Sequence, residues 1–308
     1  MAELDYKPKA APNPPTAREA PAMANTIPGV LTLLEPAGDE APVVFDSPHS
    51  GNEFPADFAS IVPERGLRAA EDAFVDDLYA EAPALGAALL SALFPRTYID
   101  PNRAVTDLDA TMIEGDWPEP LAPGDKSVKM GSGLVWRTCY PDLAMYDRKL
   151  TVAEVRGRIE SYYRPYHAAL AARLNALHER HGKVWHVNCH SMPSVSSAKS
   201  PEGRAGVERP EFVLGDRRGT TCAPEFTELV RDTLAGLGYD VRLNDPYNGA
   251  ELVVAYSAPA AGRHSLQIEI KRALYMDEEA IERNAGFQRL KTDLARLIAA
   301  ICEFAKNG

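Results

Sequence analysis

Two short apolar runs constrain the fold of this chain more than any other feature, because each leads into a histidine and then into turn-forming residues. The runs are PVVFDSPHSGN (42–52), which contains His49, and VWHVNCHSMPS (184–194), which contains His190. Runs of this length and composition are typical of buried strands. Open α/β sheets bind ligands and metals outside the carboxyl ends of their strands. The two histidines are therefore predicted to lie in such a crevice and to bind a divalent metal, and hydrogen-bonded histidines at the strand ends are the alternative.

The rest of the chain alternates β-like runs with amphipathic stretches, which is typical of α/β architecture. Strands are predicted at 42–47, 88–93, 97–100, 184–189, 211–214, 239–243 and 265–270. Helices are predicted at about 72–87, 151–181, 223–237 and 278–306, with Asp72 as the cap of the first and Thr151 and Glu154 as a capping box on the second. A Pro/Ala-rich, disordered leader is expected at 1–26, followed by one catalytic domain at 27–308.

Composition narrows the choice of partner. The formal net charge of -11 argues against nucleic acid and against an anionic membrane surface. No apolar run reaches the roughly 18 residues of a membrane span. The four cysteines are too few and too dispersed for a disulfide framework, which favours a cytoplasmic protein. A small-molecule substrate is the better hypothesis, and the sequence leaves the oligomeric state open.

A catalytic metal held by two histidines needs a third protein ligand and an open position. Glu53, Glu71 and Asp72 are the acidic candidates near His49. Glu53 lies in a loop that nothing fixes beside the imidazole, and Asn52 stands where the spacing His-x-x-Glu would place a glutamate. Asp72 opens a predicted helix and is rigidly held there, although capping that helix is its ordinary role. From these residues alone the choice of ligand stays open.

Two further segments carry candidate chemistry. In SLQIEIKRALYMDE, Glu269 lies near the end of an apolar strand, where a charge is costly unless it is paired or faces a cleft. It is therefore a candidate general base, and a salt bridge to Lys271 or Arg272 is the alternative. In TYIDPNRAVTD, Asn102 and Arg103 can bind a substrate carboxylate. As a plain loop, the same segment would form an ordinary turn.

Six motifs, taken together and in order, resemble the N-formylglutamate amidohydrolase family. They are SPHSGNEFP (47–55), EDAFVDDLY (71–79), DPNRAVTDLD (100–109), HVNCHSMPS (186–194), LGDRRGTTC (214–222) and LQIEIKRALYMDE (266–278). The resemblance spans about 42–280. It implies a single-domain α/β fold of the phosphorylase/hydrolase type, similar to zinc carboxypeptidases, with a mixed, mostly parallel sheet flanked by helices.

The resemblance also implies roles for the candidate residues. A divalent metal, with Zn²⁺ favoured over manganese, iron or cobalt, is bound by His49, Asp72 and His190. Glu269 acts as the general base. Asn102 and Arg103 hold a substrate carboxylate. Apart from the resemblance, a dicarboxylate needs more than one cationic contact, and Arg137 and Arg272 are predicted to bind the substrate as well.

The implied reaction is hydrolysis of an acidic N-acyl amino acid, such as N-formyl-L-glutamate, to formate and L-glutamate in histidine catabolism. Two alternatives stay open. One is a related zinc peptidase or amidase that acts on a small peptide. The other is a non-catalytic, ligand-binding member of the same fold.

Overall fold

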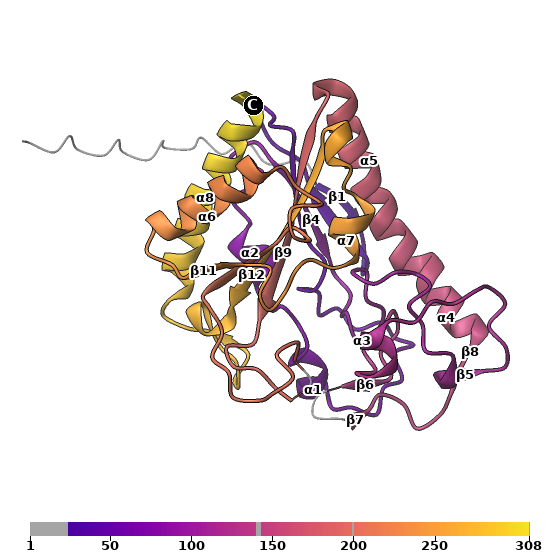
Figure 1. The fold of residues 1–308 in the computed structure, drawn as a ribbon. Coiled ribbons are helices and arrows are strands. Elements are labelled where there is room, and N and C mark those ends of the chain that lie inside the picture. Colours follow the sequence, from indigo (N-terminus) through magenta and orange to yellow (C-terminus); the bar gives the residue numbers. More distant parts are fainter. Residues whose placement is uncertain (1–23, 140–142, 199, 308) are drawn as a thin grey trace, which may run out of the picture.

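The computed structural model describes residues 24–139, 143–198 and 200–307. A single eight-stranded sheet forms its centre, in the order β1-β2-β4-β3-β9-β12-β10-β11 (Figure 1). The strands are β1 (Ala24–Ile27), β2 (Leu31–Leu34), β3 (Val43–Ser47), β4 (Ala88–Ala92), β9 (Val184–Met192), β10 (Phe212–Gly215), β11 (Val241–Leu243) and β12 (Arg263–Lys271).

The central strands β4, β3, β9 and β12 are mutually parallel, so their carboxyl ends meet at one edge of the sheet. Antiparallel pairings occur farther out, between β1 and β2, β2 and β4, and β10 and β12. This confirms the predicted mixed α/β sheet. Its parallel centre is where a ligand crevice is expected.

Helices cover both faces of the sheet (Figure 1). Strand β3 shows why, because all five of its residues are buried and alternate ones enter different cores. Phe45 packs with the residues of α6 (Pro224–Gly236) and α8 (Phe287–Asn307). Val44 points the other way, toward the residues of α5 (Arg164–His181). A strand buried on both faces reads as a continuous apolar run, which is the pattern that predicted it.

The long helical region predicted at 151–181 is confirmed, with an internal irregularity. It consists of α4 (Val152–Arg158), one π-helical turn (Ile159–Tyr163) and α5. Thr151 and Glu154 form the expected capping box, in which each side chain binds the other residue's main-chain N–H. At the far end, Gly182 adopts the left-handed φ of 74° that ends the helix.

Two of the predicted elements are wrong. Residues 97–100 form a turn, not a strand. The helix predicted at 72–87 is reduced to the four residues of α2 (Val75–Leu78), and its N-cap residue is Phe74, at a left-handed φ of 65°. Asp72 is therefore not a helix cap. Its carboxylate is used elsewhere, as described below.

The helix predicted at 278–306 begins only at Phe287, because the strands β13 (Met276–Asp277) and β14 (Glu282–Arg283) form a hairpin before it. Most of the predicted leader, 1–23, lies outside the described residues. Its last three residues belong to β1, which pairs with β2 at the sheet margin. All four residues of β1 are exposed, so the sequence carries no apolar alternation to reveal the strand.

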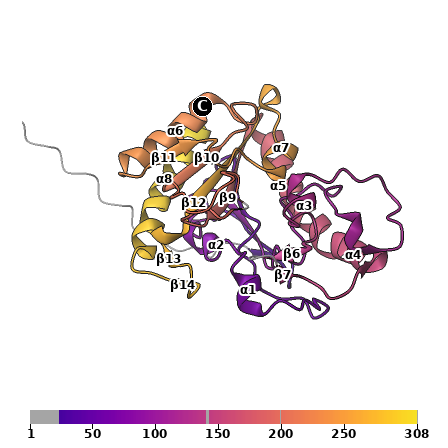
Figure 2. The same cartoon turned by 60° about the horizontal axis from the view of Figure 1, so that its bottom comes forward.

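Short elements gather around the carboxyl end of the sheet, at the bottom of Figure 1 and facing forward in Figure 2. They include α1 (Glu64–Arg68), α3 (Asp125–Val128), β6 (Thr138–Cys139) and β7 (Leu143–Ala144). The other short elements are β5 (Ile113–Glu114), β8 (Leu150–Thr151), α7 (Glu251–Ala255) and the 3-10 turns Ala110–Met112, Pro259–Ala261 and Arg272–Leu274. In the part of the chain that the structure describes, no helix is both long and apolar enough to cross a membrane.

Candidate active site

His49, Asp72 and His190 meet at the carboxyl ends of β3 and β9. His49 lies two residues beyond β3, and His190 lies near the end of β9. The segment around Asp72 is fastened to the His49 loop, since its main-chain N–H donates to the His49 carbonyl at 3.0 Å. Ser50 adds a second connection, because its hydroxyl donates to the Asp72 carbonyl at 2.9 Å. Two segments far apart in sequence are thereby held in one arrangement.

Gly51 explains why the loop after His49 has the sequence SPHSGNE. A Cβ atom at this position would lie 2.4 Å from the carbonyl carbon of Leu93 and 2.5 Å from the carbonyl oxygen of Phe94. Both contacts are with main chain, which cannot move aside as a flexible side chain can. Glycine is therefore required where the His49 loop crosses the end of β4.

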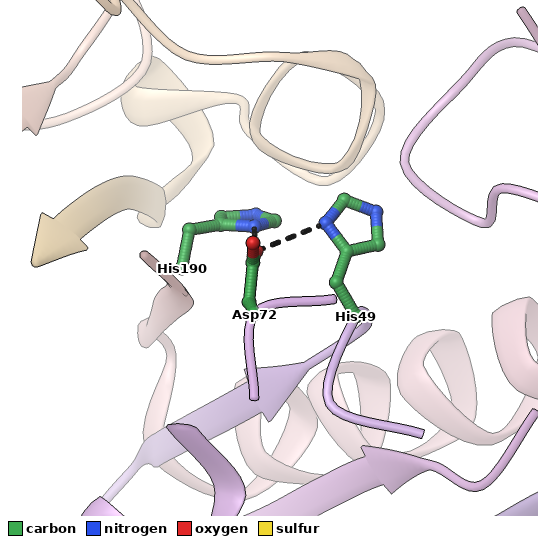
Figure 3. Close-up of side chains that lie close together, drawn as sticks. All are labelled: His49, Asp72 and His190. Atoms are coloured by element: carbon green, nitrogen blue, oxygen red, sulfur yellow. Dashed lines mark hydrogen bonds and ion pairs between the residues drawn. The ribbon is translucent and has the colours of Figure 1, made fainter. Parts of the chain in front are cut away.

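The two imidazoles converge on a single carboxylate oxygen (Figure 3). His49 Nδ1 lies 3.2 Å from Asp72 Oδ2, and His190 Nδ1 lies 2.9 Å from the same oxygen. One ligand atom from each residue falls within 4.8 Å of the others, and all three side chains are buried. The structure thus brings together the three residues predicted to bind a metal. Among the described residues, this is the one such cluster of three or more.

The other nitrogen of His49 is occupied by a carboxylate. Nε2 lies 2.7 Å from Asp100 Oδ1. Burial opposes the charge on Asp100, but Arg96, His49 and Arg103 outweigh it, so the pKa of this carboxyl is well below its usual range. An ionised carboxylate can only accept a hydrogen bond. His49 therefore carries its proton on Nε2, which leaves the lone pair of Nδ1 facing Asp72.

His190 has the same arrangement, with an amide in place of the carboxylate. Its Nε2 lies 2.6 Å from Asn188 Oδ1 and 3.0 Å from Asn102 Nδ2. The shorter contact needs a proton between the two atoms, because Oδ1 only accepts. Asn188 is held in this orientation by Asp46, whose Oδ1 accepts from Asn188 Nδ2 at 2.8 Å. His190 thus also directs an unprotonated Nδ1 toward Asp72.

When both imidazoles are neutral, three electron-rich atoms meet at this point. A cation among them removes their mutual repulsion. Ligand atoms of a tetrahedral Zn²⁺ with bonds of about 2.0–2.2 Å lie about 3.3 Å apart, which is close to the spacing found here. Two imidazoles and one carboxylate also leave the fourth position open. The residues present therefore fit a divalent metal.

The second oxygen of Asp72 is held by arginines. Arg272 Nη2 donates to Asp72 Oδ1 at 3.1 Å, and Arg96 Nη1 lies 3.7 Å from the same atom. Burial disfavours the Asp72 charge, but the close contacts with His190 and His49 and the charge of Arg96 outweigh it, so the pKa of Asp72 is well below its usual range. Asp72 is thus ionised with one oxygen fixed and the other directed at the histidines.

The register of the sheet places Glu269 beside the cluster of His49, Asp72 and His190. Glu269 pairs with His190 across the parallel strands β12 and β9, so both side chains project from the same face of the sheet. It is 7% exposed, and its Oε1 accepts from Gln267 Nε2 at 2.8 Å. Burial raises the pKa of Glu269 above its ordinary value. The predicted alternative, a surface salt bridge, does not form, because Lys271 pairs with Glu208 and Arg272 with Asp72.

Asn102 and Arg103 lie against the cluster. Asn102 Nδ2 donates to Asn188 Oδ1 at 3.4 Å, and Asn102 Oδ1 accepts from the main-chain N–H of Leu252 at 2.9 Å. Arg103 donates to the carbonyls of Asn102 and Ser132. Its Nη2 lies 3.9 Å from Asp100 Oδ2, which is too far for a hydrogen bond. Arg103 can therefore offer a donor to a ligand, whereas Asn102 supports Asn188, which orients His190.

The other predicted residues take different places. Arg272 makes three more contacts, to the carbonyls of Ala69 and Glu71 and to the Ser191 hydroxyl, and these hold it against Asp72. Arg137 pairs with Asp109 at 2.7 Å and is 38% exposed. The rival carboxylates Glu53 and Glu71 are outside the cluster of His49, Asp72 and His190. Glu71 pairs instead with Arg68, at 3.4 Å.

Sequence reasoning missed four residues that hold the cluster together. Asp46 and Asn188 orient His190, while Asp100 and Arg96 orient His49. Arg96 Nη2 donates to Asp100 Oδ2 at 2.9 Å, and its guanidinium lies 5.4 Å from the ring centroid of Trp136. Asp46 and Asn188 had one available signal, since they are polar residues within runs predicted to be buried strands. Arg96 had no comparable signal.

Comparison with known proteins agrees with this site. A profile of the N-formylglutamate amidohydrolase family matches residues 41–276. The chain belongs to this family. The predicted resemblance is thereby confirmed, over nearly the same residues. The chain is a member of a family of hydrolases that act on amide bonds, which confirms the predicted enzyme class.

Individual members of the family span most of the chain. N-formylglutamate deformylase from Pseudomonas aeruginosa is 28% identical over 78% of this chain and 84% of its own length. The N-formylglutamate deformylase from Pseudomonas putida is 29% identical over 77% of this chain and 82% of its own length. The crystal structure of N-formylglutamate amidohydrolase from Ralstonia eutropha JMP134 is 48% identical, with a TM-score of 0.87, over 91% of this chain and 99% of that one.

Proposed function

We propose that this protein is a metal-dependent amidohydrolase that cleaves N-formyl-L-glutamate to formate and L-glutamate. The observation that carries the proposal is the convergence of the Nδ1 atoms of His49 and His190 on one oxygen of Asp72. The names of the Pseudomonas and Ralstonia relatives support the substrate. A small, acidic N-formyl amino acid is therefore the proposed partner, and the catalytic domain is proposed to occupy 27–308.

His49, Asp72 and His190 would hold the metal, with Zn²⁺ as the proposed ion. Nitrogen and carboxylate ligands in this number, with one position left open, are typical of catalytic zinc sites. When bound, the ion supplies Lewis acidity, which polarises an amide carbonyl and makes a nearby water more acidic. Asp100 and Asn188 would support the metal ligands, because a hydrogen bond to Nε2 fixes the tautomer and orientation of each imidazole ring.

Glu269 is proposed to move the proton. A carboxyl with a raised pKa can accept the proton of the attacking water and return it to the leaving nitrogen. The water oxygen bonds to the formyl carbon and the C–N bond breaks. The electron pair of that bond goes to the nitrogen, which takes the proton from Glu269. Formate and L-glutamate are the products, and Glu269 is restored as a carboxylate.

Arg103 is proposed to bind the α-carboxylate of the substrate. Its Nη2 is available for a further hydrogen bond, and its position beside Asp100 keeps it close to His49. Asn102 and Arg272 are assigned positioning roles instead of the substrate contacts predicted for them, because their polar atoms are used within the protein. Arg137, paired with Asp109, has no assigned role in this proposal.

A cytoplasmic location and a place in histidine catabolism belong to the same proposal. Cys189, Cys222 and Cys302 are buried thiols without disulfides, which fits a reducing compartment. The high share of acidic residues, 44 against 33 basic ones, supports a protein that does not bind nucleic acid.

The test combines metal content with formate release. Protein purified without chelator is analysed for metals and assayed on N-formyl-L-glutamate, then assayed again after chelation and after return of Zn²⁺. The expected result is about one metal per chain and formate release that chelation abolishes and Zn²⁺ restores. Metal-free protein that releases formate at the full rate would overturn the metal dependence. Bound metal without formate release would overturn the substrate.

A further inference from the structure

Lys126 is a cation near the candidate site that has no ion-pair partner among the described residues. It belongs to the short helix α3, which lies at the carboxyl end of the sheet (Figure 2). Its side chain is half-buried, and Nζ lies 6.0 Å from the ring centroid of Tyr247. Lys129, three residues later, differs in both respects, because it is 71% exposed and pairs with Asp125 at 2.9 Å.

Lys126 and Arg103 are linked through Ser132, whose main-chain N–H donates to the Lys126 carbonyl at 2.9 Å and whose carbonyl accepts from Arg103 Nε at 3.1 Å. The charges around Lys126 are unbalanced. The guanidinium of Arg103 is the largest influence on its pKa, which Arg103, burial and Arg96 together lower to about 7. Glu269 and Asp100 act in the opposite direction and do not compensate. Asp100 is already shared by Arg96, Arg103 and His49. Holding like charges close together is unfavourable, and an anion that joins them removes the cost.

Tyr247 contacts Lys126 and a second cation. Its ring centroid lies 6.0 Å from Lys126 Nζ and 5.2 Å from the guanidinium carbon of Arg209. Arg209 already has an anionic partner, because its Nε and Nη2 donate to the two carboxylate oxygens of Glu202 at 2.8 and 3.2 Å. The uncompensated positive charge is therefore that of Lys126 and Arg103.

The loop that carries Tyr247 is fixed to the sheet. The main-chain N–H of Arg217 donates to the Asn248 carbonyl at 2.8 Å. A Cβ on Gly215 would lie 2.6 Å from the nitrogen of Gly249, so the absence of a side chain at the end of β10 lets the loop pack directly against it. Tyr247 is consequently presented by a supported loop.

We propose that Lys126 is a specificity residue that binds the side-chain carboxylate of the acyl amino acid, while Arg103 binds its α-carboxylate. This inference rests on the proposed function. Arg103 is linked to the metal-binding cluster, because it adjoins Asp100, which contacts His49. The α-carboxylate is also the one closer to the amide that is cleaved. A short dicarboxylate would place its two negative groups on these two cations and cancel their repulsion.

The test compares two substrates that differ only in charge, N-formyl-L-glutamate and N-formyl-L-glutamine. Lys126→Met is expected to lower kcat/KM for the glutamate substrate by about 10- to 100-fold, mainly through KM, since a charge-assisted hydrogen bond is lost. Activity on the glutamine substrate should change by less than about threefold, because no ion pair is removed there. Lys126→Arg should recover part of the loss.

Lys129→Met is the matched control, because it removes the same charge from the exposed residue that directly follows the same helix. It should leave both substrates unchanged. An equal loss on both substrates in Lys126→Met would assign Lys126 a structural role and overturn the proposal. Unchanged kinetics on both substrates would overturn it as well.

A binding measurement separates this inference from the proposed reaction. The zinc-loaded protein is titrated with glutarate and with its monoamide in a calorimeter. Wild-type protein should prefer glutarate, and Lys126→Met should lose that preference while binding the monoamide as before. If the wild type binds glutarate selectively but releases no formate, the proposed reaction is wrong and the proposed role of Lys126 in binding a carboxylate is supported. If the wild type shows no preference for glutarate over the monoamide, the proposed role of Lys126 is wrong, whatever the formate assay shows.

Discussion

His49 Nε2 lies 2.7 Å from Asp100 Oδ1, and this contact determines which nitrogen of His49 faces Asp72. An imidazole can bind a metal through either nitrogen, and the proton goes to the one whose partner accepts it. Asp100 is itself fixed, because Arg96 donates to its other oxygen through Nη2 at 2.9 Å. The metal-binding face of His49 is therefore set by residues that touch neither metal nor substrate.

Asp100→Asn is expected to weaken metal binding without removing a ligand. The amide can present an NH₂ group to Nε2, which would favour the wrong tautomer of His49. Loss of such an outer contact typically costs about 10- to 100-fold in metal affinity. Competition with a chromophoric zinc chelator measures the affinity. The control is Asp125→Asn, an equivalent change on a side chain that is 81% exposed, and an equal loss there would contradict the assignment.

Glu269→Gln is expected to reduce kcat on N-formyl-L-glutamate by about 10²- to 10⁴-fold, the usual contribution of a positioned general base. Glutamine has the same size and keeps an oxygen that can accept from Gln267, so the fold and the metal content should be preserved. Steady-state kinetics and metal analysis on the same sample test both parts. Glu208→Gln, on a side chain that is 80% exposed, is the control. A Glu269→Gln enzyme with wild-type kcat would assign the proton transfer to another group.

The placement of His49 and His190 could be predicted from sequence, because a buried strand that ends in a histidine and a turn is a local pattern. Glu269 could be predicted for a similar reason, as a charge in an apolar run. Arg96 could not, because its role comes from the three-dimensional approach of Asp72 and Asp100, which are separated by 28 positions in the chain. Nothing in the local sequence of Arg96 indicates which carboxylates it meets.

Asp72 shows the limit of a local rule. A carboxylate ahead of an amphipathic stretch is a normal helix cap, and the sequence alone favoured that role. In the structure α2 starts after Phe74, and the Asp72 carboxylate is held by His49, His190 and Arg272. Capping would supply one hydrogen bond from an N–H group, whereas here three charged or polar side chains converge on it. Tertiary contacts, and not the local helix-capping preference, therefore determine the conformation of Asp72.

Glu71→Gln is expected to stabilise the protein at pH 8 and to have little effect near pH 5. Burial raises the pKa of Glu71 to about 7, and its Oε1 has no hydrogen-bond partner. The folded protein thus holds a proton that the unfolded chain releases near its ordinary value of 4.5. Stability is lost as the pH rises between these two values. The gain from glutamine at pH 8 should be at most about 3 kcal/mol.

Urea unfolding at both pH values, with constant metal content, measures this difference. Glu81→Gln, on an exposed residue outside the surroundings of Glu71, is the matched control and should change neither value. A Glu71→Gln protein that is equally stabilised at pH 5 and pH 8 would show that packing, not ionisation, is responsible.

The affinity for N-formyl-L-glutamate is expected to fall as the pH rises above about 7. Lys126 has a lowered pKa because Arg103, burial and Arg96 disfavour its charge more than Glu269 and Asp100 favour it. At pH 6 its ammonium is mostly charged, and at pH 8 only about one chain in ten carries the charge. A substrate carboxylate stabilises the charged form, so binding raises the pKa and takes up a proton at pH 8. KM should therefore increase between pH 7 and 9, by up to about tenfold per pH unit.

KM for N-formyl-L-glutamine should stay constant over the same pH range. Lys126→Arg, which keeps its charge, should remove the pH dependence of KM for the glutamate substrate. Equal pH profiles of KM for the two substrates would show that Lys126 does not meet the side-chain carboxylate, because a group that senses that carboxylate must distinguish it from an amide.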